Sequence, residues 1–369
     1  MKYFFILGRN VELSKLEVFS YFEKEENKIL NFSLAKNCLM LDLEKPLEKG
    51  VVDFFGGVVS IGKLLVQSEK RSFEKLSDQK EIYFGTRNNF NYLVWNFSKD
   101  YDFVLLYLKQ RFRQEKFKAT LKHLTKNMNS QEENKIKIPS SKLLDEEYIV
   151  FDFENQILLG RIYEKCDYNK IEKRDMEKPV RREELAISPR LAKIMINLSK
   201  IKEGETLLDP FCGVGTILSE ALLQKINIIG IDKDKKAVES AEQNLKWFGF
   251  SKEKFLLKND DSRKVQIPNV DAIATEPDLG EILKKTPTEK SAKETLEKFE
   301  NLMNKILKNF NKNLNGRIVF TSPCIRVGKK RIGCDIEKII SSVPYKVINK
   351  IPEYRKNQIV GREIFVLEK

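Results

Sequence analysis

Histidine is nearly absent from this chain of 369 residues, which contains only His123. The five cysteines form no Cys-x-x-Cys pair, and they are Cys38, Cys166, Cys212, Cys324 and Cys334. An odd number of cysteines without paired spacing argues against a disulfide framework, and scarce histidine argues against the usual zinc clusters. We therefore expect no metal site, and chemistry that does not depend on histidine.

Long apolar runs are also absent. No stretch approaches the roughly 18 apolar residues of a membrane helix, and the apolar run at 3–7 is too short for a signal peptide. We therefore expect no membrane segment and a cytoplasmic location. The length of 369 residues exceeds one ordinary core, which predicts two or three domains.

Positive charge is concentrated in two regions of a chain whose net charge is +13. Residues 109–126 hold seven basic residues against one acid, and residues 301–350 hold eleven against two. Residues 201–300 hold sixteen against nineteen. Clusters with interleaved aromatics favour a polyanionic partner, whereas a generally lysine-rich surface is the alternative. The predicted phosphate contacts are Lys109, Arg111, Arg113, Lys116, Lys118, Lys122, Arg326, Lys329, Lys330 and Arg331.

The front half has the mixed pattern of an α+β region. Its periodicity predicts strands over 2–8, 28–33, 38–43, 81–85 and 92–95, helices over 11–19 and 99–115, and a hairpin over 148–151 and 157–160. Residues 126–142 are polar and predict a loop. We expect an α+β RNA-binding region over 1–160, a charged linker over 161–185 and a catalytic domain over 186–369.

The back half alternates strands and helices. Strands are predicted over 206–209, 228–232, 255–257, 272–275 and 318–320, and helices over 216–223, 235–248 and 294–310. Two final strands, 345–350 and 358–367, are close enough for an antiparallel hairpin. This alternation predicts an α/β, Rossmann-like fold whose ligand lies at the carboxyl ends of the first strands.

A glycine loop follows the first of these strands, in the sequence Asp209-Pro210-Phe211-Cys212-Gly213-Val214-Gly215-Thr216. Glycine lets the backbone turn tightly and approach a ligand closely. Leu218 stands where the dinucleotide fingerprint has its third glycine. Asp209 would repel a pyrophosphate but can meet the ammonium of S-adenosylmethionine (SAM). We therefore favour SAM over the alternatives, which are NAD and a ligand-free structural turn.

Two further acids follow later strands. Asp232 ends the second strand, 23 residues after Asp209, where a carboxylate can accept hydrogen bonds from both ribose hydroxyls. Asp260 follows the third strand and can accept a hydrogen bond from the adenine amine, although a solvated turn is the alternative. The predicted cofactor-binding residues are Asp209, Phe211, Gly213, Gly215, Thr216, Asp232 and Asp260.

The C-terminal half resembles the THUMP-containing tRNA guanosine N2-methyltransferases that modify position 10 of tRNA. The similar segments are Arg174-Asp175, Lys178-Pro179, 188–192, Asn197-Leu198, 207–218, 230–232 and 361–364, and the start over 5–14 looks like the start of that family. The resemblance implies a small N-terminal domain, a THUMP domain that grips tRNA, and a Rossmann-like catalytic domain that uses SAM.

The residues that match the family's catalytic tetrapeptide are Glu276, Pro277, Asp278 and Leu279. The family carries Asp-Pro-Pro-Tyr or Asn-Pro-Pro-Tyr there, where a side chain and a carbonyl accept the hydrogens of the target amine. Glu276 supplies an acceptor one methylene longer. Leu279 has no aromatic face for the flipped base, so Phe211, Trp247 and Tyr345 are the candidates to stack on it.

The resulting hypothesis is SAM-dependent methylation of the exocyclic N2 amine of a guanosine in tRNA, at position 10. One alternative is methylation of an exocyclic amine in ribosomal RNA or DNA with the same cofactor site. Another is a non-catalytic RNA-binding protein that keeps the fold, for which the altered tetrapeptide is the main argument. We expect a monomer that binds tRNA or another structured RNA.

Overall fold

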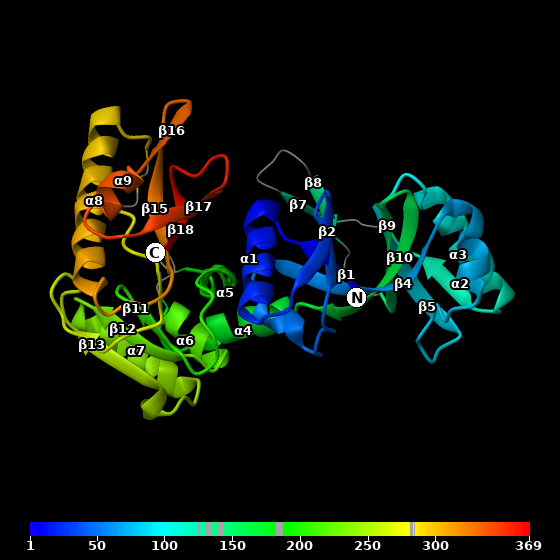
Figure 1. The fold of residues 1–369 in the computed structure, drawn as a ribbon, viewed down its shortest axis with the longest axis horizontal. Coiled ribbons are helices and arrows are strands. Elements are labelled where there is room, and N and C mark those ends of the chain that lie inside the picture. Colours follow the sequence, from blue (N-terminus) through cyan, green and yellow to red (C-terminus); the bar gives the residue numbers. More distant parts are fainter. Residues whose placement is uncertain (124–125, 130–134, 139–143, 182–186, 281–282, 284) are drawn as a thin grey trace. The chain divides into compact units, whose positions relative to one another are not determined.

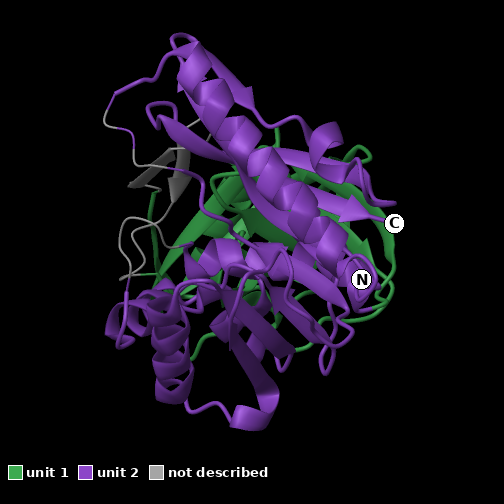
Figure 2. Cartoon of the chain, turned by 90° about the vertical axis from the view of Figure 1, so that its left-hand side faces the viewer, with its two compact units in different colours: residues 1–15, 26–53, 57–166 green, residues 16–25, 54–56, 167–369 purple. Residues whose placement is uncertain are grey.

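The computed structural model describes residues 1–123, 126–129, 135–138, 144–181, 187–280, 283 and 285–369. The chain forms two compact units, which Figure 2 colours separately. Unit 1 comprises Met1–Lys15, Glu26–Asp53 and Gly57–Cys166, and unit 2 comprises Leu16–Glu25, Phe54–Gly56 and Asp167–Lys369. Within the described residues, no helix is long and apolar enough to cross a membrane.

Unit 1 contains eight strands that join in one sheet. They are β1 (Lys2–Leu7), β2 (Ile29–Ala35), β3 (Cys38–Leu43), β4 (Val58–Ser68), β5 (Asn89–Phe97), β6 (Lys118–Leu121), β9 (Glu146–Phe153) and β10 (Gln156–Lys165). Their order is β2-β3-β1-β4-β10-β9-β5-β6 (Figure 1). Neighbours are antiparallel, except that β5 pairs in parallel with β6 and β9. One continuous sheet therefore runs through the unit.

Short helices accompany this sheet. They are α1 (Val11–Lys24), which belongs to unit 2 from Leu16 onward, α2 (Phe73–Asp78), α3 (Tyr101–Gln114) and the 3-10 turns η1 (Val51–Phe54), whose Phe54 belongs to unit 2, and η2 (Lys70–Ser72). The predicted helices over 11–19 and 99–115 are confirmed as α1 and α3, and the predicted hairpin is confirmed as β9 and β10.

Two expectations for the front half are wrong. Residues 81–85 form no strand, because their side chains rather than their backbone attach them: the Tyr83 ring stacks on Phe90 with ring centres 4.1 Å apart. The Ile82 carbonyl accepts a hydrogen bond from the Tyr148 hydroxyl. The loop expected over 126–142 contains two antiparallel strands, β7 (Lys126–Asn129) and β8 (Lys135–Ile138). The remaining residues of this stretch, 130–134 and 139–142, lie outside the described chain.

Unit 2 holds a second sheet, which is mainly parallel. Its strands are β11 (Thr206–Asp209), β12 (Asn227–Asp232), β13 (Phe255–Asn259), β14 (Ala272–Thr275), β15 (Ile318–Val327), β16 (Lys330–Gly333), β17 (Lys346–Glu353) and β18 (Val360–Glu368). The order is β13-β12-β11-β14-β15-β18-β17, with β16 paired to β15. The strands from β11 to β15 pair in parallel, whereas β18 is antiparallel to β15 and β17. The predicted strand alternation and terminal hairpin are confirmed.

The helices of unit 2 follow local signals in the sequence. They are α4 (Tyr168–Glu177), α5 (Pro189–Leu198), α6 (Thr216–Leu223), α7 (Lys235–Trp247), α8 (Glu289–Phe310), α9 (Ile336–Ile340) and the 3-10 turn η4 (Lys252–Lys254). The Ser188 hydroxyl caps α5 by accepting the Leu191 amide, and Pro189 occupies the first turn, where its missing N–H costs nothing. On α8, which lies along β15, an apolar stripe that includes Leu296 and Met303 is buried (Figure 1).

The stretch expected to be a linker, 161–185, contains the end of β10 and helix α4, and residues 182–186 lie outside the described chain. The predicted division into domains over 1–160 and 186–369 stays a prediction. In unit 2, parallel pairing brings the carboxyl ends of β11, β12 and β14 to one edge of the sheet. This edge carries Asp209, Asp232 and Glu276.

Candidate active site

The glycine loop joins β11 to α6, and its two glycines have different roles. Gly213 has φ of 52° and Gly215 has φ of 83°, in the left-handed region that favours glycine. A Cβ at Gly215 would lie 3.2 Å from the Cβ of Ala241 on α7, whereas a Cβ at Gly213 would meet nothing within 4 Å. Gly215 therefore allows the loop to pack on α7, and Gly213 leaves its own side open.

Asp209 ends β11 as a buried carboxylate with 2% of its surface exposed. Its Oδ1 accepts hydrogen bonds from the Thr275 hydroxyl at 2.6 Å and the Phe211 amide at 3.1 Å. Burial raises the pKa of Asp209 to about 7, the two hydrogen bonds oppose this, and the charges of Asp232 and Glu276 raise it further. The three acids therefore lie close enough to interact, and a bound cation would relieve their repulsion.

Asp232 ends β12 and ties the loop to the next turn. Its Oδ2 accepts the Gly213 amide at 3.0 Å, and its Oδ1 accepts the Asp234 amide at 2.9 Å. The Asp260 amide donates to the Asp232 carbonyl at 3.2 Å, which places the exposed Asp260 beside it. The structure therefore places three of the predicted cofactor-binding acids, Asp209, Asp232 and Asp260, next to the glycine loop.

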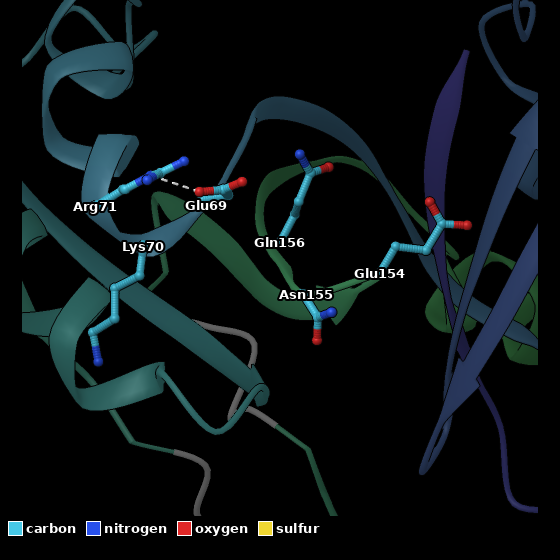
Figure 3. Close-up of a pocket in the computed structure, with 6 residues that line it drawn as sticks. All are labelled: Glu69, Lys70, Arg71, Glu154, Asn155 and Gln156. Carbon is cyan, nitrogen blue, oxygen red and sulfur yellow. Dashed lines mark ion pairs between the residues drawn. The ribbon is translucent and has the colours of Figure 1, made fainter.

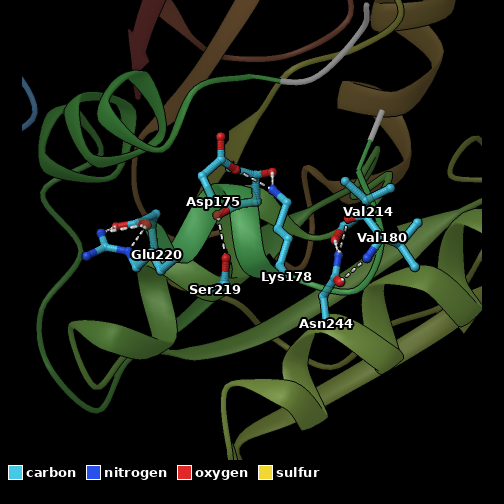
Figure 4. Close-up of polar contacts among 9 residues, drawn as sticks. Asp175, Lys178, Val180, Val214, Ser219, Glu220 and Asn244 are labelled. Carbon is cyan, nitrogen blue, oxygen red and sulfur yellow. Dashed lines mark hydrogen bonds and ion pairs between the residues drawn. The ribbon is translucent and has the colours of Figure 1, made fainter. Parts of the chain in front are cut away.

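Asn244 on α7 holds the loop from behind, and sequence reasoning missed it. Its Nδ2 donates to the carbonyls of Val214 at 2.9 Å and Val180 at 3.0 Å, and its Oδ1 accepts the Val180 amide at 3.0 Å (Figure 4). Asn244 is 1% exposed and lies on the same buried stripe as Ala237 and Ala241. A polar residue on such a stripe was the available signal.

Charged residues before α5 support the helix that begins at the loop. The Nε and Nη2 groups of Arg174, on α4, donate hydrogen bonds to the carboxylate of Glu220 on α6, at distances of 2.7 to 3.1 Å. Burial raises the pKa of Glu220, and Arg174 opposes the rise. The buried Lys178 ammonium donates to Asp175 at 2.6 Å and to the hydroxyl of Thr216 at 3.3 Å (Figure 4). These family-like residues thus position α6.

Glu276 follows β14, and its carboxylate is paired with Arg362 of β18. The Nε of Arg362 donates a hydrogen bond to Oε1 of Glu276. Burial raises the pKa of Glu276, while the Arg362 charge and hydrogen bond lower it. The sequence showed Arg362 within a family-like segment but indicated no role for it.

Contacts with the surrounding protein hold the other residues of the tetrapeptide in place. Pro277 is buried, and the carboxylate of the exposed Asp278 accepts the Gly280 amide at 3.0 Å. Leu279 packs against the apolar cluster under α8. Among the aromatics that could stack on a base, Tyr345 is 4% exposed and its hydroxyl donates to the Gly316 carbonyl, Trp247 is 43% exposed at the end of α7, and Phe211 lies within the glycine loop.

The predicted phosphate contacts divide into exposed and occupied groups. Arg111 bonds to Asp78 at 3.0 Å and to Glu115 at 2.6 Å. Burial lowers the pKa of Arg111, but its hydrogen bonds with Glu115 and Tyr107 more than offset this and raise it. Arg331 donates to the carbonyls of Cys324, Arg355 and Gln358 and lies over the Tyr354 ring. The side chains of seven other predicted contacts are exposed or half-buried: Lys109, Arg113, Lys116, Lys118, Lys122, Arg326 and Lys329. The exposed Lys330 pairs with Glu289 at 3.0 Å.

Outside this site, a pocket in unit 1 and the cysteines are the other features that could carry chemistry. A polar pocket of about 530 Å³ in unit 1 is lined by six residues, none of them a predicted site residue: Glu69, Lys70, Arg71, Glu154, Asn155 and Gln156 (Figure 3). Its arginine pairs with Glu69 and its lysine with Asp100, so these charges already have partners. The described residues hold no group of three or more candidate metal ligands, and the five cysteines are buried and form no disulfide.

Comparison with known proteins identifies this region as a methyltransferase domain. A family model described as the RMKL-like methyltransferase domain matches residues 179–324, and a DNA methylase family model matches residues 48–243. Both matches include the glycine loop and Asp232. A tRNA (guanine(10)-N2)-dimethyltransferase of Methanothermobacter thermautotrophicus is 42% identical over 109 residues, which are 29% of this chain and 32% of that protein.

A protein of Methanothermococcus thermolithotrophicus, named a probable tRNA (guanine(10)-N2)-dimethyltransferase, is 30% identical over 155 residues, which are 40% of this chain and 85% of that protein. The chain belongs to the tRNA (guanine(10)-N2)-dimethyltransferase family. A further member from Methanocaldococcus jannaschii is 32% identical over 40% of this chain and 39% of its own length. The match with the Methanothermobacter and Methanocaldococcus relatives thus spans about a third of their length.

Solved structures share the fold over the whole chain. TrmN from Thermus thermophilus has a TM-score of 0.54 at 14% identity and covers all of both chains. A possible methylase from Clostridium difficile has a TM-score of 0.50 at 16% identity, over all of this chain and 98% of its own. At such identities the likeness concerns the fold alone.

Proposed function

We propose that this protein transfers a methyl group from SAM to the exocyclic N2 amine of a guanosine in tRNA, at position 10. The observation that carries the proposal is the set of three carboxylates, Asp209, Asp232 and Glu276, that interact at one edge of a parallel sheet beside a glycine loop. Membership in a family whose relatives are named for this reaction supports it.

The residues at the loop fit SAM better than a dinucleotide. Burial raises the pKa of Asp209, and the charges of Asp232 and Glu276 raise it further; an ammonium or sulfonium charge would relieve this repulsion, whereas a pyrophosphate would increase it. Asp232 uses one lone pair of each oxygen for the amides of Gly213 and Asp234 and retains others for ribose hydroxyls. Phe211, Thr216 and Asp260 complete the proposed site.

The chemistry follows from what Glu276 can accept. SAM supplies a methyl group made electrophilic by its sulfonium. The guanine amine is a poor nucleophile because its lone pair is delocalised into the ring, so a carboxylate that accepts an amine hydrogen aligns that lone pair. The nitrogen gains the methyl group and loses one proton, which becomes acidic only after the transfer and passes to Glu276. No base with a pKa near neutrality is needed, in agreement with a chain that has one histidine.

The RNA partner is supported by the basic residues. We assign residues 1–160 to RNA binding through a small N-terminal domain and a THUMP-like domain, and residues 186–369 to methyl transfer, in a cytoplasmic monomer. The proposed phosphate contacts include the exposed cations Arg113, Lys116 and Lys118 on one unit, and the exposed Lys329 and half-buried Arg326 on the other. Arg111 and Arg331 contribute less, because other groups occupy their donors.

A second function is favoured by one observation. The DNA methylase family model matches 196 residues of the chain, from 48 to 243, so an exocyclic amine in DNA is the alternative substrate. The test is transfer of labelled methyl from SAM to unmodified tRNA, ribosomal RNA and DNA, followed by mass spectrometry of the nucleosides. We expect N2-methylguanosine or its dimethyl form in tRNA. Methylated adenine or cytosine in DNA would replace the proposal, and no transfer to any of the three would refute it.

A further inference from the structure

Arg362 connects two strands that are not neighbours. It lies on β18 and reaches Glu276 after β14, across β15, which separates those strands in the sheet. The side chains of Arg362 and Glu276 are 24% and 9% exposed. Within the described chain, Glu276 is the side chain that hydrogen-bonds and forms an ion pair with Arg362, so this contact is the main polar interaction of the guanidinium group.

The pair leaves one oxygen of Glu276 available. Arg362 occupies Oε1, and a carboxylate has two oxygens with about four lone-pair positions. The buried hydroxyl of Thr321, on the intervening β15, lies near enough to lower the pKa of this carboxyl group, although its geometry falls short of a full hydrogen bond. A glutamate one methylene longer than the family's aspartate therefore has one hydrogen-bond partner, Arg362, that limits its rotation.

We propose that Arg362 is the positioning residue for Glu276: its guanidinium fixes one carboxylate oxygen and leaves the other to accept the amine of the substrate. This inference rests on the proposed function. Arg362 acts through Glu276, and in this role the methyl donor and the base need no contact with it. The arginine thereby compensates for the longer and more flexible acid at this position.

The electrostatic surroundings give the proposal a signature. Burial raises the pKa of Glu276 and Arg362 lowers it, while Asp209 on β11 is an acid that repels it. Loss of Arg362 therefore moves the pKa of Glu276 upward, so the ionised acceptor is lost as pH falls and returns as pH rises. Arg362 is the cation that acts on this carboxylate in the described residues, and Thr321 is its uncharged neighbour.

The experiment measures kcat and KM for tRNA from pH 6 to pH 9 in wild type, Arg362→Met, Arg362→Lys, Glu276→Gln and the double variant Arg362→Met with Glu276→Gln. We expect Arg362→Met to lower kcat at pH 7 by about 10- to 100-fold, the scale of a misplaced catalytic group, with KM changed less than about threefold. The loss should shrink as pH rises, and Arg362→Lys should restore part of kcat. Adding Arg362→Met to Glu276→Gln should change little, because glutamine does not ionise.

Arg317→Met is the matched control. Arg317 directly precedes β15 and pairs at 2.8 Å with Glu368, which lies on β18 at the opposite end from Arg362. Arg317→Met should leave the pH profile of kcat unchanged. A pH-independent loss in Arg362→Met, full additivity with Glu276→Gln, or a change in KM alone would each refute the positioning role. Carboxyl-carbon NMR of Glu276 in the wild type and Arg362→Met gives a readout that needs no activity. If the wild type transfers no methyl group, the proposed function is refuted. If the titration of Glu276 is the same in the wild type and the variant, the positioning role of Arg362 is refuted whatever the activity.

Discussion

The carboxylate of Asp232 accepts a hydrogen bond from the backbone amide of Gly213 at 3.0 Å. This contact fixes the glycine loop against the end of β12. The second oxygen binds the Asp234 amide, at the start of α7, so one acid orders both segments that face a cofactor. Preorganisation of this kind lowers the entropy that a ligand must overcome on binding.

Asp232→Ala should weaken SAM binding by about 1.5–3 kcal/mol, the scale of hydrogen bonds to a charged group, because both the ribose acceptor and the anchor of Gly213 are lost. Asp232→Asn should lose less, since it retains one oxygen. Isothermal calorimetry measures the affinity. Asp261→Ala is the control, because its carboxylate pairs with the exposed Arg263. Unchanged affinity in Asp232→Ala would remove the ribose role.

The raised pKa of Asp209 makes SAM affinity depend on pH. With a pKa of about 7 in the free protein, Asp209 is protonated below neutrality and cannot attract the ammonium of SAM. We expect the affinity to fall on the order of tenfold for each pH unit below 7, and Asp209→Asn to abolish this dependence. Calorimetry in buffers of different ionisation enthalpy should also detect proton release on binding near pH 6.5. A pH-independent affinity in wild type would contradict the assignment.

The raised pKa of Asp209 should also affect the free energy of unfolding, but in the opposite direction: low pH weakens SAM binding and favours the folded state. The folded pKa of about 7 lies above the ordinary value of 3.8, so between these values the unfolded chain is ionised and the folded chain is not. The unfolded state then binds fewer protons, and this contribution to the free energy of unfolding falls as pH rises from about 4 to about 7. Urea unfolding of wild type and Asp209→Asn across this range isolates it. An equal slope in both proteins would show that Asp209 is not the group.

Glu276→Ala should lower the rate of methyl transfer by roughly 100-fold or more, because it removes one positioned polar group at the reacting nitrogen. Glu276→Gln retains one acceptor oxygen and should keep part of the activity. SAM affinity should survive in both variants. Asp278→Ala, which removes only the bond to the Gly280 amide, should cost less. The assay is transfer of labelled methyl to unmodified tRNA at saturating SAM, and wild-type rates in Glu276→Ala would show that another residue accepts the amine.

Two arginines on one helix should behave differently in RNA binding. Arg113→Ala removes an exposed cation of α3 and should reduce the slope of log affinity against log salt by about 1. Arg111→Ala breaks bonds to Asp78, Glu115 and Tyr107, so it should lower the thermal midpoint and change the salt slope less. Fluorescence titration with tRNA at several salt concentrations gives the slopes. Equal slopes for wild type and Arg113→Ala would remove Arg113 from the interface.

The sequence by itself determined the strand, glycine loop and helix over 206–223, because every signal there is local. The apolar strand, the acid at its end and the glycines with positive φ lie within a few residues of one another. The position of Asp232 also followed from spacing along the chain, and a short connection predicted the terminal hairpin of β17 and β18. The bounds of β11, β14 and α6 agree with the prediction to the residue.

Only the tertiary structure decided which distant side chains meet. Glu276 and Arg362 are 86 residues apart, and Asn244 and Val180 are 64 apart. Neither contact can be predicted from the pattern of apolar and polar residues in the sequence. Strand order and register across a sheet depend on packing of the whole unit rather than on nearby residues. The same reason explains residues 81–85: their apolar pattern suits a strand, but stacking of Tyr83 on Phe90 attaches them by side chains instead of backbone pairing.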